Sequence, residues 1–268
     1  SVVHLNNAGA SLMPQVVLDT VIGHLELESR TGGYEAAAME EARVEGVYDS
    51  IAALVGCARD EVAVIENATR AWDMAFYSIA LEPGDRLLTT HAEYASNYIA
   101  LLQVAERTGA VVEVVENDAW GQVSLEALER ALPGARVVSL VHVPSHGGLV
   151  QPAAEVGRLC REHGALFLLD ACQSVGQLPV DVGELGCDML SATGRKFLRG
   201  PRGTGFLYVR RALIEELQPP FLDLHAVEWI DAERYEIRAD ARRFENWETS
   251  FAGKLGLGAA VDYAVGWG

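Results

Sequence analysis

Lys196 and Asp170 are the two residues of this chain whose surroundings most favour chemistry. Lys196 ends a turn of small residues, S-A-T-G-R-K, shortly before the glycine-rich stretch G-P-R-G-T-G. Asp170 ends the apolar run L-F-L-L-D, which predicts a buried strand that finishes on a carboxylate. A lysine amine can form an imine with an aldehyde cofactor, and a buried carboxylate can keep the ring nitrogen of that cofactor protonated. The pair therefore points to pyridoxal 5'-phosphate (PLP), which needs both groups.

Two further segments could hold the phosphate and the ring of such a cofactor. The sequence E-N-A-T-R-A, which contains Ala68 and Thr69, joins a predicted strand to a predicted helix. Free backbone N–H groups and the helix dipole bind anions at such a junction, although a plain helix capped by Thr69 gives the same pattern. Tyr94 follows the next predicted strand and could stack on a planar ring, but an ordinary loop or core tyrosine would look the same.

Residues beside Asp170 and Lys196 complete the candidate site. Gln173 could hydrogen-bond the phenolic oxygen of the cofactor, and the Thr193 hydroxyl and Arg195 could contact its phosphate. An aspartate at this place could also be a plain helix N-cap, and most lysines are solvated. The interpretation therefore rests on the order in which all the pieces occur along the chain.

The elements that would position these residues alternate between strand and helix. Such alternation predicts an α/β fold with three layers, α/β/α, around a mainly parallel central sheet. The expected strands are apolar and mostly uninterrupted, as in a sheet covered on both faces. Ligands of such sheets bind beyond the carboxyl ends of the strands, so Asp170 and Lys196 could share one crevice. We expect strands at 60–66, 86–90, 110–115, 136–142, 165–170, 187–192 and 205–209, and helices at 69–80, 97–108, 124–131 and 153–163.

Composition argues against several other classes of protein. The net charge of −17 repels phosphate backbones, so nucleic acid is not an expected partner. No basic run and no long uncharged apolar stretch occurs, which favours a cytoplasmic protein without membrane association. The four cysteines are far apart and never form C-x-x-C, which argues against a disulfide scaffold and against structural zinc. His142 and His146 flank a loop without a third ligand, so we expect no metal.

Taken together, these residues resemble the PLP-dependent fold-type I enzymes of the aminotransferase class V group. That group includes cysteine desulfurases, isopenicillin N epimerase-like proteins, kynureninase-like enzymes and several C–S lyases. The resemblance covers nearly the whole chain, beginning with H-L-N-N-A-G at 4–9, which is similar to the family's Y-L-D-N-A-A. N-A-T at 67–69 stands where the family binds phosphate, and D-x-x-Q at 170–173 matches the family's own D-x-x-Q. T-G-R-K at 193–196 matches [ST]-G-H-K, which makes Lys196 the imine lysine.

The C-terminal part of the chain carries a further match. R-F-E at 243–245, followed by Thr249, resembles the family's R-F-E-x-G-T segment. In the family this threonine reaches the phosphate held by the neighbouring subunit. The resemblance therefore implies a homodimer with composite active sites, in which Thr249 belongs to the partner's cofactor site.

Several positions depart from the family pattern. Tyr94 replaces the histidine that stacks on the ring, and Arg195 replaces the histidine before the lysine, where it would strengthen the grip on phosphate. The family's asparagine near the cofactor oxygen falls at Ser145 or His146. The loop that carries a desulfurase's persulfide cysteine, and the arginines for the substrate carboxylate, would come after residue 268. None of the cysteines present, at 57, 160, 172 and 187, stands at that persulfide position.

The resemblance implies a function and a domain organisation. We expect an N-terminal segment near the active site at 1–12 and the PLP-binding large domain at 13–268, with the small C-terminal domain missing or incomplete. The expected substrate is a small molecule, either an amino acid or an amine, and Lys196 would also shuttle the proton at its Cα. An aminotransferase or C–S lyase is our first hypothesis, followed by a cysteine desulfurase and an amino-acid epimerase. A PLP-binding structural or regulatory subunit and a nucleotide-binding α/β protein are the alternatives from other classes.

Overall fold

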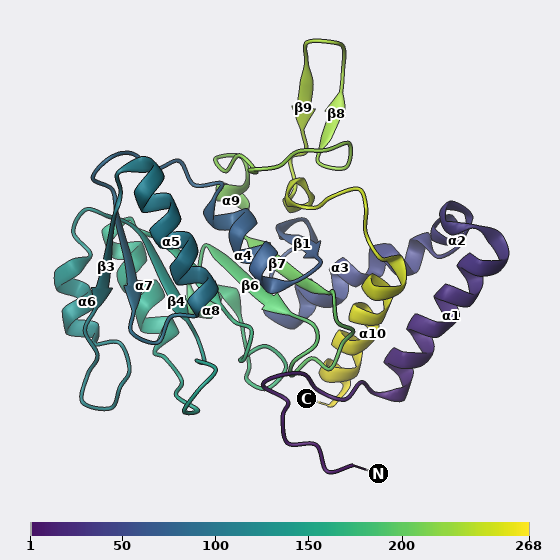
Figure 1. Cartoon of the computed structure of the whole chain (residues 1–268), viewed down its shortest axis with the longest axis horizontal. Coiled ribbons are helices and arrows are strands. Elements are labelled where there is room, and N and C mark those ends of the chain that lie inside the picture. The colour runs from purple at the N-terminus through teal and green to yellow at the C-terminus, as the bar shows by residue number, and fades with distance from the viewer. Residues whose placement is uncertain (1, 268) are drawn as a thin grey trace.

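A seven-stranded sheet forms the centre of the molecule in a computed structural model that describes residues 2–267 (Figure 1). Its strand order is β1-β7-β6-β5-β4-β2-β3. Strands β2 to β6 run parallel, whereas β7 is antiparallel to both β6 and β1. The mainly parallel sheet predicted from the sequence is therefore confirmed. The strands are β1 (Val62–Ile65), β2 (Arg86–Thr90), β3 (Val111–Val115), β4 (Ala135–Val141), β5 (Leu166–Asp170), β6 (Met189–Thr193) and β7 (Gly205–Val209).

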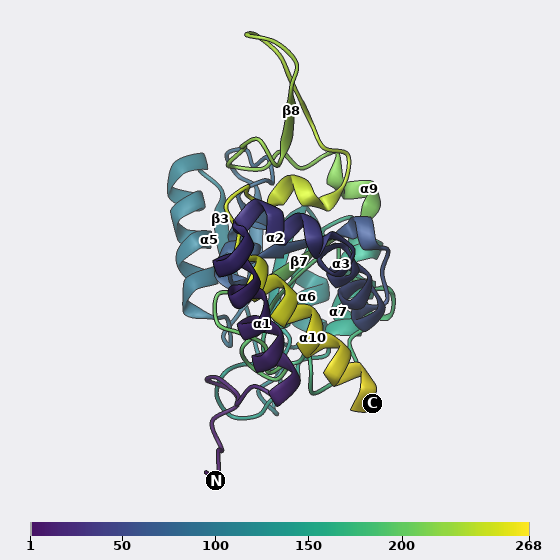
Figure 2. The same cartoon turned by 90° about the vertical axis from the view of Figure 1, so that its right-hand side faces the viewer.

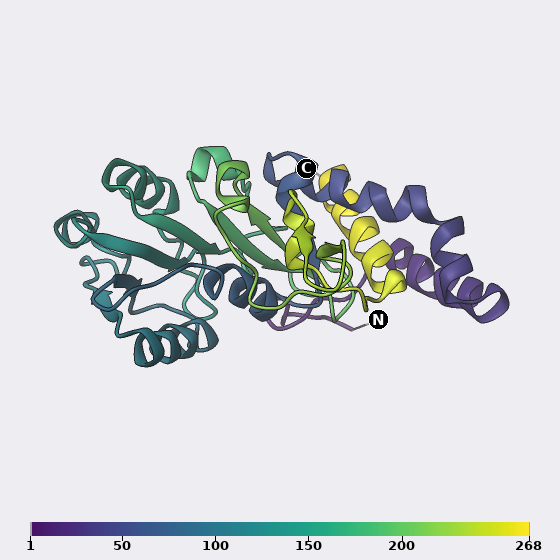
Figure 3. The same ribbon diagram turned by 90° about the horizontal axis from the view of Figure 1, so that it is seen from above.

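Helices cover both faces of this sheet, which gives the expected three layers (Figure 3). Alternate residues of one strand enter different cores because successive side chains point to opposite faces. In β5, Phe167 and Leu169 belong to the core that also holds residues of α3, α6, α7 and α10, whereas Leu168 belongs to the core with residues of α4, α5 and α9. The helices are α1 (Gln15–Thr31), α2 (Gly33–Met39), α3 (Glu41–Val55), α4 (Ala68–Phe76), α5 (Ala95–Thr108), α6 (Leu125–Ala131), α7 (Ala153–His163), α8 (Val182–Leu185), α9 (Arg211–Ile214) and α10 (Phe251–Trp267).

Elements at the two ends of the chain build the part of the molecule beyond the β1 edge of the sheet. Helices α1, α2 and α3 gather there with α10, from the other end of the chain (Figures 1 and 2). A two-stranded hairpin, β8 (Val227–Trp229) and β9 (Tyr235–Ile237), projects from the body. None of these elements was predicted from the sequence. Among the described residues, no helix combines the length and the apolar character that crossing a membrane requires.

The sequence-predicted elements need small corrections at their ends. The first strand is shorter than the predicted 60–66, because Asp60 and Glu61 lie in a 3-10 turn, η1 (Arg59–Glu61), ahead of β1. The predicted helix at 69–80 begins at Ala68 and ends at Phe76. Its cap is Asn67, whose side chain accepts a hydrogen bond from Arg70 N at 2.9 Å, so the expectation that Thr69 could cap this helix was wrong.

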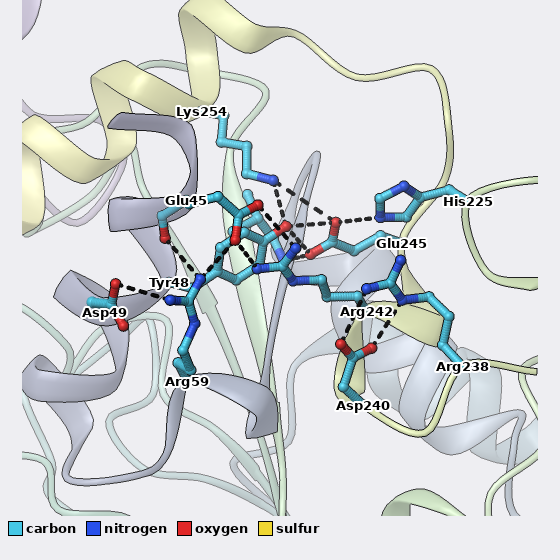
Figure 4. A network of polar contacts seen from close by, with 11 residues as sticks. Glu45, Tyr48, Asp49, Arg59, His225, Arg238, Asp240, Arg242, Glu245 and Lys254 are labelled. Atoms are coloured by element: carbon cyan, nitrogen blue, oxygen red, sulfur yellow. Dashed lines mark hydrogen bonds and ion pairs between the residues drawn. The ribbon is translucent and has the colours of Figure 1, made fainter. Parts of the chain in front are cut away.

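A group of polar side chains, buried except for the half-buried His225, lies where α3, β1 and α10 meet the turn η2 (Ala241–Phe244) (Figure 4). The Glu245 carboxylate accepts hydrogen bonds from Tyr48 OH at 2.9 Å and from Val64 N at 2.7 Å, and His225 Nε2 lies 3.0 Å away. Lys254 Nζ donates to Tyr48 OH at 2.5 Å and lies 3.9 Å from Glu245. We call these side chains, Tyr48, His225, Glu245 and Lys254, the Glu245 cluster. It ties distant segments of the chain together.

Candidate active site

A cavity of about 470 Å³ opens at the carboxyl ends of the parallel strands. Asp170 is the last residue of β5 and Thr193 the last residue of β6, and these strands are adjacent and parallel. The turn after β6 carries Lys196 back over the same edge. The structure thus brings together eight of the nine residues that the sequence singled out: Ala68, Thr69, Tyr94, Asp170, Gln173, Thr193, Arg195 and Lys196 all line this cavity.

Asp170 is held by two neutral donors and no cation. Its side chain is 5% exposed. Oδ1 accepts a hydrogen bond from Cys172 N at 2.9 Å, and Oδ2 accepts one from Asn97 Nδ2 at 3.1 Å. Within residues 2–267 no lysine, arginine or histidine forms an ion pair with it. A carboxylate has about four acceptor positions, and a buried carboxylate without a cation is costly. Asp170 therefore offers the cavity open acceptor positions that suit a positively charged ring nitrogen.

Lys196 is the second unpaired group of the cavity. Its side chain is 9% exposed, and among the described residues its Nζ has neither a hydrogen-bond partner nor an ion pair. Buried lysines are rare unless they are paired. The neighbouring Cys172 thiol is close to both Lys196 and Asp170, and burial followed by the charge of Asp170 raises its pKa well above the ordinary value of 9.0. The amine of Lys196, not the thiol of Cys172, is therefore the nucleophile that this cavity offers.

The N-terminus of α4 forms one end of the cavity. Ala68 and Thr69 are its first two residues, and an α-helix leaves the N–H groups of its first turn free to bind an anion. Since Asn67 caps the helix, the Thr69 hydroxyl is not needed for capping. Gly205 lets β7 pass close to this turn, because a Cβ there would lie 2.6 Å from Ala192 O and 3.2 Å from Ala68 N. The end of the cavity thus fits a phosphate group.

Tyr94 and Gln173 lie where a ring would need partners. Tyr94 lines the cavity and is 44% exposed, so it is not a core tyrosine. Gln173 Nε2 donates to Ala8 O at 3.2 Å and to Ser145 Oγ at 3.4 Å. Its buried Oε1 has no hydrogen-bond partner within the described part of the chain. A buried polar atom without a partner is unusual in a folded protein, and a bound group that donates a hydrogen bond would satisfy it.

The N-terminal segment lies against the lysine turn. Arg195 Nη1 donates a hydrogen bond to Gly9 O, and Ser11 N donates to Arg195 O at 2.9 Å. Gln173 reaches the same segment through Ala8. Arg195 therefore lines the cavity while it also anchors the segment that the sequence analysis expected near the active site.

Thr249 lies apart from the other candidate residues. It lines a second cavity of about 420 Å³, together with Glu66, Gly203 and Glu245. Within one chain it does not contribute to the first cavity. A role at the phosphate of a second subunit, which the family resemblance implies, stays a prediction.

Sequence reasoning missed several residues of the cavity wall. Asn97, Cys172 and His91 line it as well, and Glu93 was noted only as part of a motif. Ser145 and His146, the two alternatives for the family's asparagine, both line the cavity. The spacing of Glu93 and Asn97, four residues apart at the start of a helix, is the one signal that could have pointed to a polar pair there. Among residues 2–267, no three His, Cys, Asp or Glu side chains gather as a metal site would require.

Comparison with known proteins gives a consistent result. The family model of aminotransferase class V matches residues 3–268. A probable cysteine desulfurase of Pyrococcus abyssi is 27% identical over 98% of this chain, and one of Synechocystis sp. is 31% identical over 97%. The solved apo structure of a cysteine desulfurase from Thermococcus onnurineus NA1 superposes with a TM-score of 0.92 at 26% identity, covering 98% of this chain and 67% of that one. A cystine C–S lyase, C-DES, shares the fold with a TM-score of 0.89 at 23% identity, covering 98% of this chain and 71% of the other.

The match covers only part of each relative. The chain spans 67% of the Pyrococcus protein and 64% of the Synechocystis protein.

Proposed function

The chain belongs to the aminotransferase class V family of PLP-dependent enzymes, and from this premise we propose that it cleaves the C–S bond of cysteine or a closely related amino acid. The sequence alone ranked an aminotransferase or C–S lyase before a desulfurase. The curated relatives are named cysteine desulfurases, which favours the desulfurase reaction over transamination.

One observation carries this proposal: the unpaired amine of Lys196 and the unpaired carboxylate of Asp170, both buried, line a single cavity. A protein that only bound PLP as a structural or regulatory subunit would have no need of both. Both groups cost stability when they are buried without a partner. PLP would pair with each of them, since it brings an aldehyde and a ring nitrogen that becomes cationic.

Each residue of the cavity would have a defined task. When bound, PLP supplies an electron sink for negative charge at the substrate Cα. Asp170 would keep the ring nitrogen protonated, and Gln173 would hydrogen-bond the phenolic oxygen. The N-terminus of α4, with Thr69, would bind the phosphate together with Thr193 and Arg195. The amine of Lys196 would attach the cofactor and would take up and return the proton at the substrate Cα.

The sulfur acceptor distinguishes the two C–S reactions. A desulfurase transfers sulfur to a thiolate, which requires a cysteine of low pKa. Burial raises the pKa of Cys57 and of Cys160 to about 12, and it raises the pKa of Cys187 as well. Of the four cysteines, all of which lie within the described residues, Cys172 alone lines the cavity, and its pKa is raised too. None of these thiols is therefore suited to accept sulfur, so we expect a thiol outside this chain to do so.

The products formed from cysteine distinguish a desulfurase from a C–S lyase and from an aminotransferase. We would incubate the PLP-loaded protein with L-cysteine and excess dithiothreitol, and measure sulfide, alanine, pyruvate and ammonia. A desulfurase forms alanine and passes the sulfur to the added thiol, which releases it as sulfide. A C–S lyase forms equal amounts of sulfide, pyruvate and ammonia. Transamination would give a keto acid without sulfide and would contradict the proposal, as would wild-type protein that shows no visible chromophore after PLP is added.

Assembly and location belong to this proposal too. We propose a homodimer in which Thr249 contributes to the partner's site, because the R-F-E segment with Thr249 follows the family pattern. All four cysteines are free, which suits a cytoplasmic protein. Sedimentation of the PLP-loaded protein tests the dimer, and a monomer with full activity would rule it out.

A further inference from the structure

Asn97, a buried residue of the cavity wall, has no part in the function proposed above. It lies in the first turn of α5 and is 2% exposed. Its Nδ2 donates two hydrogen bonds, one to Asp170 Oδ2 at 3.1 Å and one to Glu93 Oε1 at 3.0 Å. Carboxylate oxygens only accept, so turning the amide round would lose both bonds. Asn97 therefore bridges two acidic side chains in one defined orientation.

Glu93 is a rigid support for this amide. Its Oε2 accepts hydrogen bonds from Thr89 Oγ1 at 2.8 Å and from Ser139 Oγ at 2.7 Å. Its Oε1 accepts from Tyr94 N at 2.8 Å in addition to Asn97. The four donors come from β2, β4 and the start of α5, and they fill the acceptor positions of the carboxylate. Glu93 thus has no free position for a ligand, in contrast to Asp170.

Asp170 needs support on both of its oxygens. A carboxyl group can rotate about its last bond, and that rotation changes the direction of its lone pairs. Cys172 N holds Oδ1 and Asn97 holds Oδ2, so together they define the carboxylate plane. The acceptor positions that remain point away from these two donors. The orientation of Asp170 toward a ring nitrogen thus depends on Asn97.

We propose that Asn97 is a positioning residue for Asp170 and that Glu93 holds Asn97 in place. This inference rests on the proposed function, because the orientation of Asp170 matters only if that carboxylate holds the PLP ring nitrogen. Asn97 lines the cavity, and we assign its effect to the hydrogen bond that it donates to Asp170. Its contribution is geometric, since a misplaced catalytic group loses rate without losing binding in proportion.

The test compares N97A with the matched control Q103A in the PLP-loaded protein. Gln103 is an exposed amide on the same helix, and within residues 2–267 its side chain takes part in a single hydrogen bond, which it accepts from Tyr77 OH. We expect N97A to lower kcat about tenfold while KM and the PLP dissociation constant change less than about threefold. The pH midpoint of the visible absorption band should shift in N97A, because the ring nitrogen responds to the orientation of Asp170. Q103A should match the wild type in all four quantities.

A second variant separates position from charge. E93Q removes a negative charge but keeps an oxygen that can accept from Asn97, while the hydroxyls of Thr89 and Ser139 can rotate to suit the new amide. We expect E93Q to lose only about threefold in kcat. A loss in E93Q as large as in N97A would show that the charge of Glu93 matters, and it would overturn the positioning role.

Other results also count against this inference or against the function beneath it. Wild-type kcat and an unchanged spectral midpoint in N97A would refute the positioning role and leave the proposed function intact. A wild-type protein without a PLP chromophore would instead refute the proposed function. If N97A does not fold, N97L keeps nearly the size of the side chain and removes the donor without adding a charge, and the same loss of kcat and shift of the midpoint are expected.

Discussion

The cavity at the strand ends and the Glu245 cluster both contain buried charged side chains. They differ in whether these charges have partners of opposite sign. In the cluster, Glu245 is surrounded by donors, and Lys254 has both Tyr48 and Glu245 as partners (Figure 4). In the cavity, neither Lys196 nor Asp170 has an oppositely charged partner among the described residues. Paired buried charges hold the fold together, whereas unpaired ones lower its stability and are available to a ligand.

The two regions also differ in what they connect. The Glu245 cluster joins segments from both ends of the chain, since Tyr48 and Glu245 are 197 residues apart. The cavity joins the ends of neighbouring strands and is supported by a loop and a helix start. Replacing a residue of the cluster should therefore lower the stability of the fold. Replacing a residue of the cavity should instead lower the catalytic rate. Four predictions test this difference.

The largest effect is expected for Lys196→Ala. This variant should lose at least about a thousandfold in turnover, because it removes both the attachment point and the proton shuttle. It should keep or raise the melting temperature of the apo protein, since it removes a buried amine that has no partner. Steady-state kinetics, the visible spectrum and thermal unfolding of the apo protein measure these effects. A large drop in melting temperature would contradict the contrast between the two regions.

Glu245→Ala should have the opposite profile. It leaves Lys254 buried without its carboxylate partner, and breaking a buried pair in this way costs about 3–5 kcal/mol. Denaturant unfolding of the apo protein measures the loss in the free energy of unfolding. The matched variant E245Q, which keeps one oxygen that can accept these hydrogen bonds, should lose less. An E245A protein of wild-type stability would show that the cluster does not hold the fold together.

Asp170→Asn is expected to have a smaller effect than Lys196→Ala. The amide keeps much of the shape of the carboxylate and part of its hydrogen bonding, so some PLP should still bind. Turnover should fall by about a hundredfold, because the ring nitrogen is no longer held protonated by a negative charge. PLP titration and kinetics separate binding from turnover. Full activity in this variant would refute the role of Asp170.

The smallest effect concerns how the free energy of unfolding depends on pH. Burial alone would raise the pKa of Glu245, but the hydrogen bond from His225 and the charge of Lys254 outweigh it and hold that pKa below 4.5. Burial raises the pKa of Glu93 above 4.5, and the charge of Asp170 adds to this. Glu245 therefore stabilises the fold above pH 4.5 and loses this effect as the pH falls through its folded pKa. Glu93 has the opposite effect on the free energy of unfolding. Its stabilising contribution is complete below pH 4.5, where the carboxyl group is protonated, and is lost as the pH rises through its folded pKa.

The two variants E245Q and E93Q measure these opposite slopes. Apo proteins would be unfolded with denaturant from about pH 3 to about pH 8. The advantage of the wild type over E245Q should grow as the pH rises, whereas its advantage over E93Q should shrink. If both differences in the free energy of unfolding changed with pH in the same direction, the pKa values of Glu245 and Glu93 would be shifted in the same direction, which would contradict the prediction.

Much of the fold could be predicted because its signals are local. The run L-F-L-L-D forms β5 because apolar residues on both sides of a strand suit a sheet covered on both faces. The helix at 153–163 was predicted at the bounds that α7 has. The ends of other elements depend on which residue caps them, and at α4 both Asn67 and Thr69 are residue types that cap helices. Helices α1 to α3 and α10 escaped prediction, since they take their stability from packing against one another.

The sequence by itself determined the residues that can do chemistry, because Lys196, Asp170 and their neighbours occur in order with residue types that suit one cofactor. Tertiary structure alone decided which polar groups are paired and which are left open. Asn97 touches Asp170 across 73 residues of chain, and Glu245 touches Tyr48 across 197. Hydrogen bonds over such separations depend on how strands and helices come together in space, and no local pattern of residues records that arrangement.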